Sequence, residues 1–447
     1  MTQDSDSNEH KAPLTCSFCG IEKSADVPLI AGNEGHICEH CVKLAHQVVS
    51  SWGRRAALVR PELKAPHIIK QYLDEYIIGQ DDAKKTLSVA LFNHYLRLNN
   101  QDVEQPFSTE PQRENVDVEK SNVLMTGPSG AGKTLLVKTL SRIIGVPFVI
   151  GDATALTQAG YVGQDVESLL KRLLEAADWD VQQAEWGIVY VDEIDKIAKR
   201  GDGGTAVRDI SGEGVQQALL KMIEGAEIRV TKPGQREGHG EEVMLNTQNI
   251  LFIVGGAFPG LVELVSKRLV PSESGIGFNA PLKKESEFSN NELLAALQPD
   301  DLQKFGLIPE FIGRFPIVTF LQDLDADALR RILTEPKNAL VKQYRRLFSY
   351  QGVELVFSDE SLTFIAEQAV ERGTGARGLR GILETLLCDT MFEAPKIDGL
   401  IRCEVVVVED QDVPDRNKLE ITKVVSPESH TSAGVNQERS SLSASVI

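Results

Sequence analysis

The stretch Gly127-Pro-Ser-Gly-Ala-Gly-Lys-Thr134 constrains this chain more than any other. It follows residues 122–126, an apolar run that predicts a buried strand, and it leads into residues 135–144, which predict a helix. Its glycines allow backbone N–H groups to turn towards an anion, and the N-terminus of the helix adds the positive end of a dipole. The strand–loop–helix order therefore predicts a phosphate-binding loop for a nucleoside triphosphate.

Each residue of this loop is a candidate nucleotide ligand. The ammonium of Lys133 is expected to reach the β- and γ-phosphates, and the hydroxyl of Thr134 is expected to bind Mg²⁺. The other candidates surround the phosphates or open the helix: Gly127, Pro128, Ser129, Gly130, Ala131, Gly132 and Leu135.

A second landmark is the run 187–191, which ends in the adjacent carboxylates Asp192 and Glu193. In a doubly wound α/β sheet, ligands bind beyond the carboxyl ends of the strands. Asp192 is therefore expected to hold Mg²⁺, directly or through water, and Glu193 to polarise the water that attacks the γ-phosphate. Acid pairs after a strand are common by chance, but beside a phosphate loop they predict nucleoside triphosphate hydrolysis, with Lys133 as a third catalytic residue.

Two Cys-x-x-Cys pairs lie near the N-terminus, Cys16 with Cys19 and Cys38 with Cys41. Each pair can direct two thiolates at one ion, so together they predict a tetrahedral Zn²⁺ site. A redox pair is the competing interpretation, but it would not need a second matched pair. Four thiolates fill the shell, so the neighbouring histidines are expected to be surface residues: His36, His40 and His46. A module this short has a small core, and its folding should be coupled to metal binding.

Composition narrows the range of functions. The 447 residues carry a net charge of −18, which disfavours a chain built to coat nucleic acid, although it does not exclude a small basic patch. There is no apolar run long enough to cross a membrane. The first residues are polar and acidic with no apolar segment behind them, which is not the pattern of a secretory signal, so a cytoplasmic location is expected.

The order of patterns predicts several domains. We expect a zinc-binding module over 1–50, a linker over 51–65, an α/β domain with a doubly wound parallel sheet over 66–320, a small α+β domain over 321–425, and a disordered tail over 426–447. Within the small domain, the apolar positions predict one long helix from Ala326 to Ser349. Cys388 and Cys403 are expected to be core residues.

With these residues assembled, the chain resembles the ClpX family of AAA+ ATPases, from Cys16 to about Val408. Gly127–Thr134 resembles the family's Walker A loop, and Val191-Asp-Glu193 resembles its Walker B motif. The four-cysteine module in front of the ATPase core distinguishes this family from the related HslU unfoldases, which lack it. The resemblance implies a homohexameric, ATP-dependent unfoldase that serves the ClpP peptidase and takes tagged or unfolded proteins, with adaptor proteins as further partners.

The resemblance also implies a role for each matching segment. Ile77–Gln80 resembles the adenine-contacting turn, with Ile78 in contact; Arg314 resembles the arginine finger that acts on the neighbouring subunit's ATP; and Arg377 resembles the sensor-2 arginine on the γ-phosphate. A planar, permanently charged guanidinium suits both arginine roles. The other matches are a substrate-gripping pore loop with Tyr161 and Val162, and a ClpP-docking loop with Ile276, Gly277 and Phe278. Taken singly, Tyr161 or either arginine would more often be a surface residue.

Two segments depart from the pattern. The second pore loop of the family carries an Arg-Lys-His triplet, whereas this chain spreads Lys232, Arg236 and His239 among acids and glycines. The strand ending at Val254 continues into Gly255-Gly256, where many AAA+ relatives place a polar sensor residue.

Two rival functions follow from the residues alone. One is a nucleic-acid remodelling ATPase that reads through the zinc module. The other is a zinc-dependent adaptor with a degenerate ATPase core. The acidic composition argues against the first, and the complete set of catalytic residues argues against the second.

Overall fold

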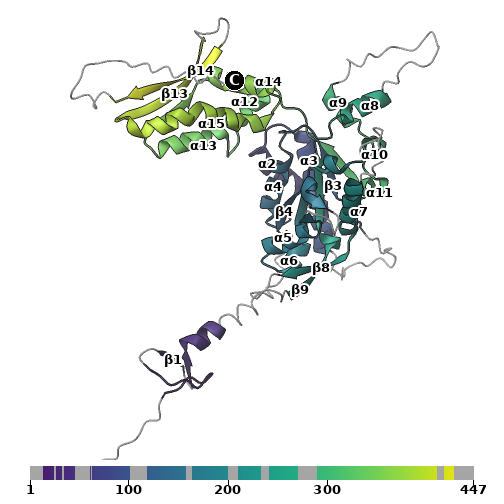
Figure 1. The fold of residues 1–447 in the computed structure, drawn as a ribbon, viewed down its shortest axis with the longest axis vertical. Helices are drawn as coiled ribbons and strands as arrows, with labels where there is room; N and C mark the ends of the chain where they lie inside the picture. Colours follow the sequence, from purple (N-terminus) through teal and green to yellow (C-terminus); the bar gives the residue numbers. More distant parts are fainter. Residues whose placement is uncertain are drawn as a thin grey trace, which may run out of the picture. The chain divides into compact units, whose positions relative to one another are not determined.

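The computed structural model describes residues 14–24, 27–32, 35–45, 61, 63–100, 118–157, 164–199, 210–232, 241–269, 289–409 and 417–426 (Figure 1). The chain divides into two compact units, residues 1–60 and 61–447, which are described separately. Among the described residues, no helix combines the length and the apolar character needed to cross a membrane. Most of the predicted linker and tail lie outside the described residues, at 51–60 and 427–447.

The first unit is a small hairpin with a short helix. Strands β1 (Leu29–Ala31) and β2 (His36–Cys38) pair antiparallel, and residues 39–45 are helical. Its buried residues are Cys16, Cys38 and Cys41, against which Val27, Leu29 and Ile37 pack. This apolar interior is too small to hold the unit together by burial alone.

A five-stranded sheet organises the second unit. Its order is β11-β3-β10-β7-β4, and every neighbouring pair is parallel. The strands are β3 (Val123–Thr126), β4 (Phe148–Asp152), β7 (Ile188–Asp192), β10 (Leu251–Gly256) and β11 (Ile317–Phe320). Since all five run the same way, their carboxyl ends meet at one edge.

Helices cover both faces of this sheet (Figure 1). Alternate residues of β3 show the division: Val123 and Met125 belong to one core, and Leu124 belongs to the other. The first core includes α2 (Pro66–Asp74), α3 (Asp81–Asn100) and α4 (Lys133–Ile144). The second includes α5 (Ser168–Ala176), α7 (Ile210–Glu224), α8 (Leu261–Leu269), α10 (Pro299–Phe305) and α11 (Pro309–Gly313). The predicted doubly wound α/β fold is confirmed.

Several smaller elements complete the second unit. They are α6 (Val181–Glu185), α9 (Asn290–Ala295), the parallel pair β5 (Leu156–Thr157) and β6 (Gln164–Asp165), and the antiparallel hairpin β8 (Glu227–Lys232) and β9 (Glu241–Asn246). Short 3₁₀ turns are η1 (Ala153–Ala155), η2 (Ile194–Ile197), η3 (Thr247–Asn249) and η5 (Ala394–Lys396).

The C-terminal part has its own sheet and its own core. Strand β12 (Glu354–Phe357) pairs parallel with β13 (Leu400–Glu409), which pairs antiparallel with β14 (Asn417–Val425). Helices α12 (Ala326–Thr334), α13 (Leu340–Ser349), α14 (Asp359–Glu371) and α15 (Ala376–Glu393) supply the rest of this core. The predicted α+β class of this part is confirmed.

Two predictions for this part are wrong. The single helix expected from Ala326 to Ser349 is two helices, because Pro336 has no N–H to donate and its ring would clash within a continuous helix. Cys388 is exposed on α15, whereas Cys403 is buried as expected. One of the two predicted core cysteines therefore lies at the surface.

Candidate active site and zinc centre

The loop between β3 and α4 has a backbone that only glycine adopts easily. Gly127, Gly130 and Gly132 have φ angles of 146°, 83° and 100°. A Cβ at Gly127 would lie 2.7 Å from the carbonyl oxygen of Leu321, and one at Gly130 would lie 2.7 Å from that of Thr374. Two of the three glycines are therefore also required by the close approach of other backbone segments.

Lys133, the first residue of α4, lies inside this loop. Its ammonium donates hydrogen bonds to the carbonyl oxygens of Gly127 at 2.7 Å and Pro128 at 3.0 Å. Burial lowers the pKa of Lys133, and the nearby Asp192 carboxylate opposes that shift. The loop thus surrounds a buried cation, as the binding of a polyphosphate requires.

The end of β7 with Asp192 and Glu193 lies beside the phosphate loop, because both are at the carboxyl edge of the sheet. The hydroxyl of Thr134 donates to Asp192 Oδ2 at 2.6 Å, and the backbone N–H of Glu193 donates to Asp192 Oδ1 at 3.0 Å. Glu193 adopts a left-handed φ of 56°, which is uncommon for a residue other than glycine. Such a conformation at the end of a central strand is a common feature of functional sites.

Arg377 approaches the loop from the C-terminal part of the unit. Its guanidinium donates to Ser129 Oγ at 3.2 Å. Gly375, which precedes α15, lies so close that a Cβ there would be 3.2 Å from the carbonyl oxygen of Ser129. The structure therefore brings together four predicted site residues from distant segments: Lys133, Thr134, Asp192 and Arg377.

Ile78 is buried in the turn between α2 and α3. The turn has positive φ angles at Gly79 and Gln80, 62° and 60°. Gln80 exchanges two hydrogen bonds with the backbone of Gln322, at 2.9 and 2.8 Å. These bonds fix the turn to the chain that follows β11.

Arg314 is not part of this cluster. Its backbone carbonyl accepts a hydrogen bond from Asn122, which precedes β3, so it lies at the amino edge of the sheet. The four residues of β3 add roughly 13 Å between this edge and the phosphate loop. The guanidinium is instead paired with Glu224 at the end of α7, at 2.6 Å.

Four residues of this region have no role of their own in the sequence-based prediction. Gln80 and Glu224 find their partners across 242 and 90 residues, so no local pattern reveals them. Tyr190 and Asp195 belong to the acidic motif, residues 187–195, which consists of β7 and the carboxylates at its end. A tyrosine within an otherwise aliphatic strand, and a third carboxylate just beyond it, are the signals that were available.

Several predicted segments fall outside the described residues. They are the pore loop with Tyr161 and Val162, the docking loop with Ile276, Gly277 and Phe278, and the part of the second pore loop with Arg236 and His239.

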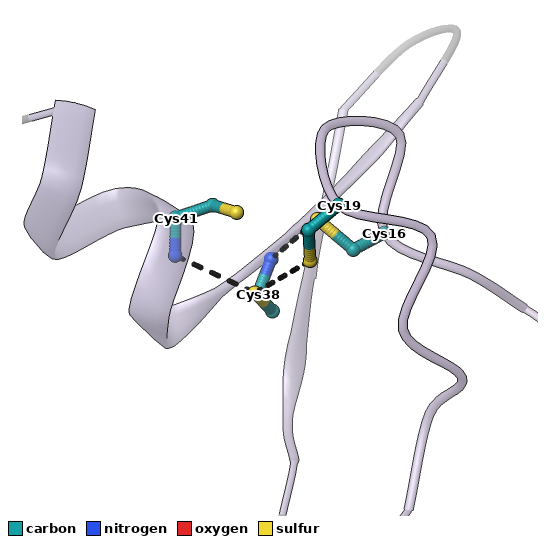
Figure 2. A group of neighbouring side chains, drawn as sticks. All are labelled: Cys16, Cys19, Cys38 and Cys41. Atoms are coloured by element: carbon teal, nitrogen blue, oxygen red, sulfur yellow. Dashed lines mark hydrogen bonds between the residues drawn. The ribbon is translucent and has the colours of Figure 1, made fainter.

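The four cysteines of the first unit converge (Figure 2). Their sulfur atoms all lie within 4.8 Å of one another. Tetrahedral zinc at about 2.3 Å from each sulfur separates the sulfurs by roughly 3.8 Å, so the set fits this ion. His36 is paired in β2 through its backbone, and the described cluster contains no histidine.

Backbone donors favour thiolate ligands here. The N–H of Cys38 points at Cys16 Sγ, and that of Cys41 at Cys38 Sγ, each at 3.4 Å. Burial raises the pKa of Cys16, but backbone hydrogen bonds from Cys19, Cys38 and Phe18 outweigh it and lower the pKa to about 6. The hydrogen bond with Cys19, together with burial, raises the pKa of Cys41 to about 12, so a bound cation is needed to hold all four groups as thiolates.

Each of these parts of the chain matches a known protein family. Residues 14–51 match the ClpX C4-type zinc finger, residues 118–318 match the AAA domain (Cdc48 subfamily), and residues 324–406 match the C-terminal, D2-small domain of ClpB protein. The first match supports zinc as the ion of the four cysteines, and the second supports ATP as the nucleotide, with ATPase activity.

Two curated relatives cover most of the chain. The ATP-dependent Clp protease ATP-binding subunit ClpX of Azotobacter vinelandii is 63% identical over 399 residues, which is 89% of this chain and 90% of the relative. The ATP-dependent Clp protease ATP-binding subunit ClpX 3 of Methylococcus capsulatus is 55% identical over 395 residues, 87% of this chain and 91% of the relative. With a zinc finger, an AAA domain and a small C-terminal domain in the same order, the chain belongs to the ClpX family of Clp protease ATPase subunits.

Proposed function

We propose that this protein is an ATP-driven unfoldase that forms a homohexameric ring and passes unfolded chains to the ClpP peptidase. The observation that carries the proposal is the position of Arg314 at the sheet edge opposite the phosphate loop. An arginine finger held there cannot reach the nucleotide of its own chain. It suits a ring in which each subunit completes the site of its neighbour.

Each residue of the site then has a role. Lys133 and Arg377 bind the phosphates, the turn at Ile78 borders the adenine, and Arg314 of the adjacent subunit stabilises the charge that develops during transfer. Glu193 accepts the proton of the attacking water. Thr134 and Asp192 would hold Mg²⁺, since their oxygens lie 2.6 Å apart and a hydroxyl with a carboxylate suits this ion. The ion would neutralise charge on the phosphates.

Loops of the family supply the mechanical part of the proposal. Tyr161 and Val162 would grip the substrate chain, and the apolar segment of Ile276, Gly277 and Phe278 would dock on ClpP. The expected partners are tagged proteins and adaptor proteins. We expect the protein to bind neither nucleic acid nor membranes, and we expect it in the cytoplasm. We also propose the domain limits 1–50, 51–65, 66–320, 321–425 and 426–447.

Complementation tests whether the site is shared. Lys133→Ala and Arg314→Ala should each lose most ATP turnover as pure proteins. In mixed rings, the intact loop of an Arg314→Ala subunit can face the intact arginine of a Lys133→Ala subunit, so mixing should restore part of the turnover. If each variant is inactive alone and mixing restores nothing, Arg314 does not act between subunits.

The activity is tested by adding ClpP, ATP and a tagged, folded fluorescent protein. We expect fluorescence to fall and peptides to appear. Tyr161→Ala should keep ATP turnover but leave the substrate folded, and deletion of 276–278 should spare unfolding but stop peptide release. Unchanged fluorescence with the parent protein, or turnover that requires DNA, would contradict the proposal.

A further inference from the structure

The hydroxyl of Tyr190 is a buried polar group without a described partner. Tyr190 is fully buried in β7, two residues before Asp192, and its hydroxyl makes no hydrogen bond to any described residue. A buried hydroxyl left unpaired costs about 1–3 kcal/mol. Such groups are few in folded proteins, so this one calls for an explanation.

The end of β10 is shaped around this hydroxyl. Tyr190 is paired in register with Ile253, and Gly255 follows on the same face of β10. A Cβ at Gly255 would clash with the Tyr190 hydroxyl oxygen, and one at Gly256 would lie 2.5 Å from Asp195 Oδ1. Two polar groups of the acidic motif therefore occupy the space that side chains of β10 would fill.

The hydroxyl lies beside the pair formed by Thr134 and Asp192. The register pairs Val254 with Val191, so Gly255 lies level with Asp192. The Tyr190 hydroxyl, which fills the space beside Gly255, lies next to this carboxylate. A phenol is protonated at neutral pH and can donate a hydrogen bond. In this structure Asp192 Oδ2 already has a donor in the Thr134 hydroxyl, at 2.6 Å.

We propose that Tyr190 is a positioning residue, whose hydroxyl becomes the donor to Asp192 when Thr134 turns towards the nucleotide and its ion. The polar group comes from β7, because β10 ends in Gly255 and Gly256 and offers no polar side chain there. The inference rests on the proposed roles of Thr134 and Asp192. It explains why a hydroxyl is buried at this point and why position 255 of the adjacent strand is a glycine.

Tyr190→Phe tests the inference, because it removes one oxygen atom and keeps the ring. Without nucleotide, the midpoint of thermal unfolding of the full chain should stay the same or rise, since no hydrogen bond is lost. ATP turnover should fall about fivefold to tenfold, the size expected for one hydrogen bond. The Mg²⁺ concentration for half-maximal turnover should rise, and the increase in midpoint caused by Mg²⁺ with a non-hydrolysable ATP analogue should shrink.

Tyr95→Phe is the matched control. Tyr95 is equally buried, but its hydroxyl donates to the carbonyl oxygen of Trp186 at 2.9 Å. This variant should lower the unfolding midpoint without nucleotide and leave turnover unchanged. If Tyr190→Phe lowers the midpoint as Tyr95→Phe does, or keeps full turnover at every Mg²⁺ concentration, the inference is wrong. An inactive parent protein would instead refute the proposed function.

Discussion

Three buried cysteines and three half-buried aliphatic side chains form the described interior around the zinc site, whereas the phosphate loop rests on a sheet with an apolar core on each face. In the first unit the ligand has to replace a core, because so little apolar surface is removed from water. In the second, the core holds the loop in place, and Lys133, Thr134 and Asp192 are already oriented by hydrogen bonds. Zinc is therefore needed for the first unit to fold, whereas the nucleotide binds to a second unit that is held together by its own core.

Removing zinc should give the largest effect. Zinc contributes about 10–16 kcal/mol to the folding of zinc-finger peptides, so chelation or Cys38→Ser should unfold residues 14–45. Bound zinc and the dispersion of amide signals of this unit would report the loss. The unfolding midpoint of residues 61–447 should not change.

Cys388→Ser is the control for that substitution, because Cys388 is exposed on α15. It removes a thiol from the same chain without touching the cluster, and it should leave one zinc bound. A Cys38→Ser protein that keeps both its zinc and its dispersed spectrum would contradict the comparison.

Replacing Glu193, the proposed general base, should give the next largest effect, and it should affect only the chemical step. Glu193→Gln should lower ATP turnover by about 10²–10⁴-fold, the usual contribution of a general base. Nucleotide binding and the unfolding midpoint should stay close to those of the parent protein, because the fold does not depend on this ligand. Glu367→Gln, at an exposed position of α14, should change none of the three quantities. Normal phosphate release from Glu193→Gln would refute the assigned role.

Lowering the pH should decrease the free energy of unfolding of the second unit, and this effect should be smaller than the two above. His94 is buried on α3, and burial, reinforced by the charges of Arg97 and Lys120, lowers its pKa to about 3. Since the unfolded chain takes up the proton near pH 6.5, stability should be complete above that pH and fall progressively as the pH drops towards 3. Between pH 7 and pH 5 the loss should be about 2 kcal/mol.

Replacing His94 by leucine should flatten this acid dependence in urea unfolding experiments. The exposed His67 on α2 provides the control, since His67→Leu also removes an imidazole but leaves the core intact. If the two variants show the same slope between pH 7 and pH 5, burial of His94 is not the cause.

Local motifs predicted the parts of the site that lie close together in sequence. The phosphate loop needs glycines and a lysine at fixed spacing, and the acidic strand needs a run of apolar residues, so both could be found without a structure. The arrangement of Arg314 with Glu224, and of Gln80 with Gln322, depends on which strands become neighbours. The pairing of β7 with β10, which brings the Tyr190 hydroxyl to Gly255, depends on it too.

One difference between prediction and structure has a local cause in the sequence. Pro336 divides α12 from α13, and a proline within a predicted helix of that length is a reason to divide it. The exposed position of Cys388 could not be predicted in the same way, because the face that α15 turns to the core follows from its packing against the second sheet.

The close approach of Gly130 to Thr374 has a mechanical consequence. The phosphate loop and the segment before α15 touch main chain to main chain, and neither Gly130 nor Gly375 has a side chain at the junction. Side chains can change rotamer and absorb a small displacement, but two backbones in contact cannot. A shift of the loop towards this segment would therefore have to displace the start of α15.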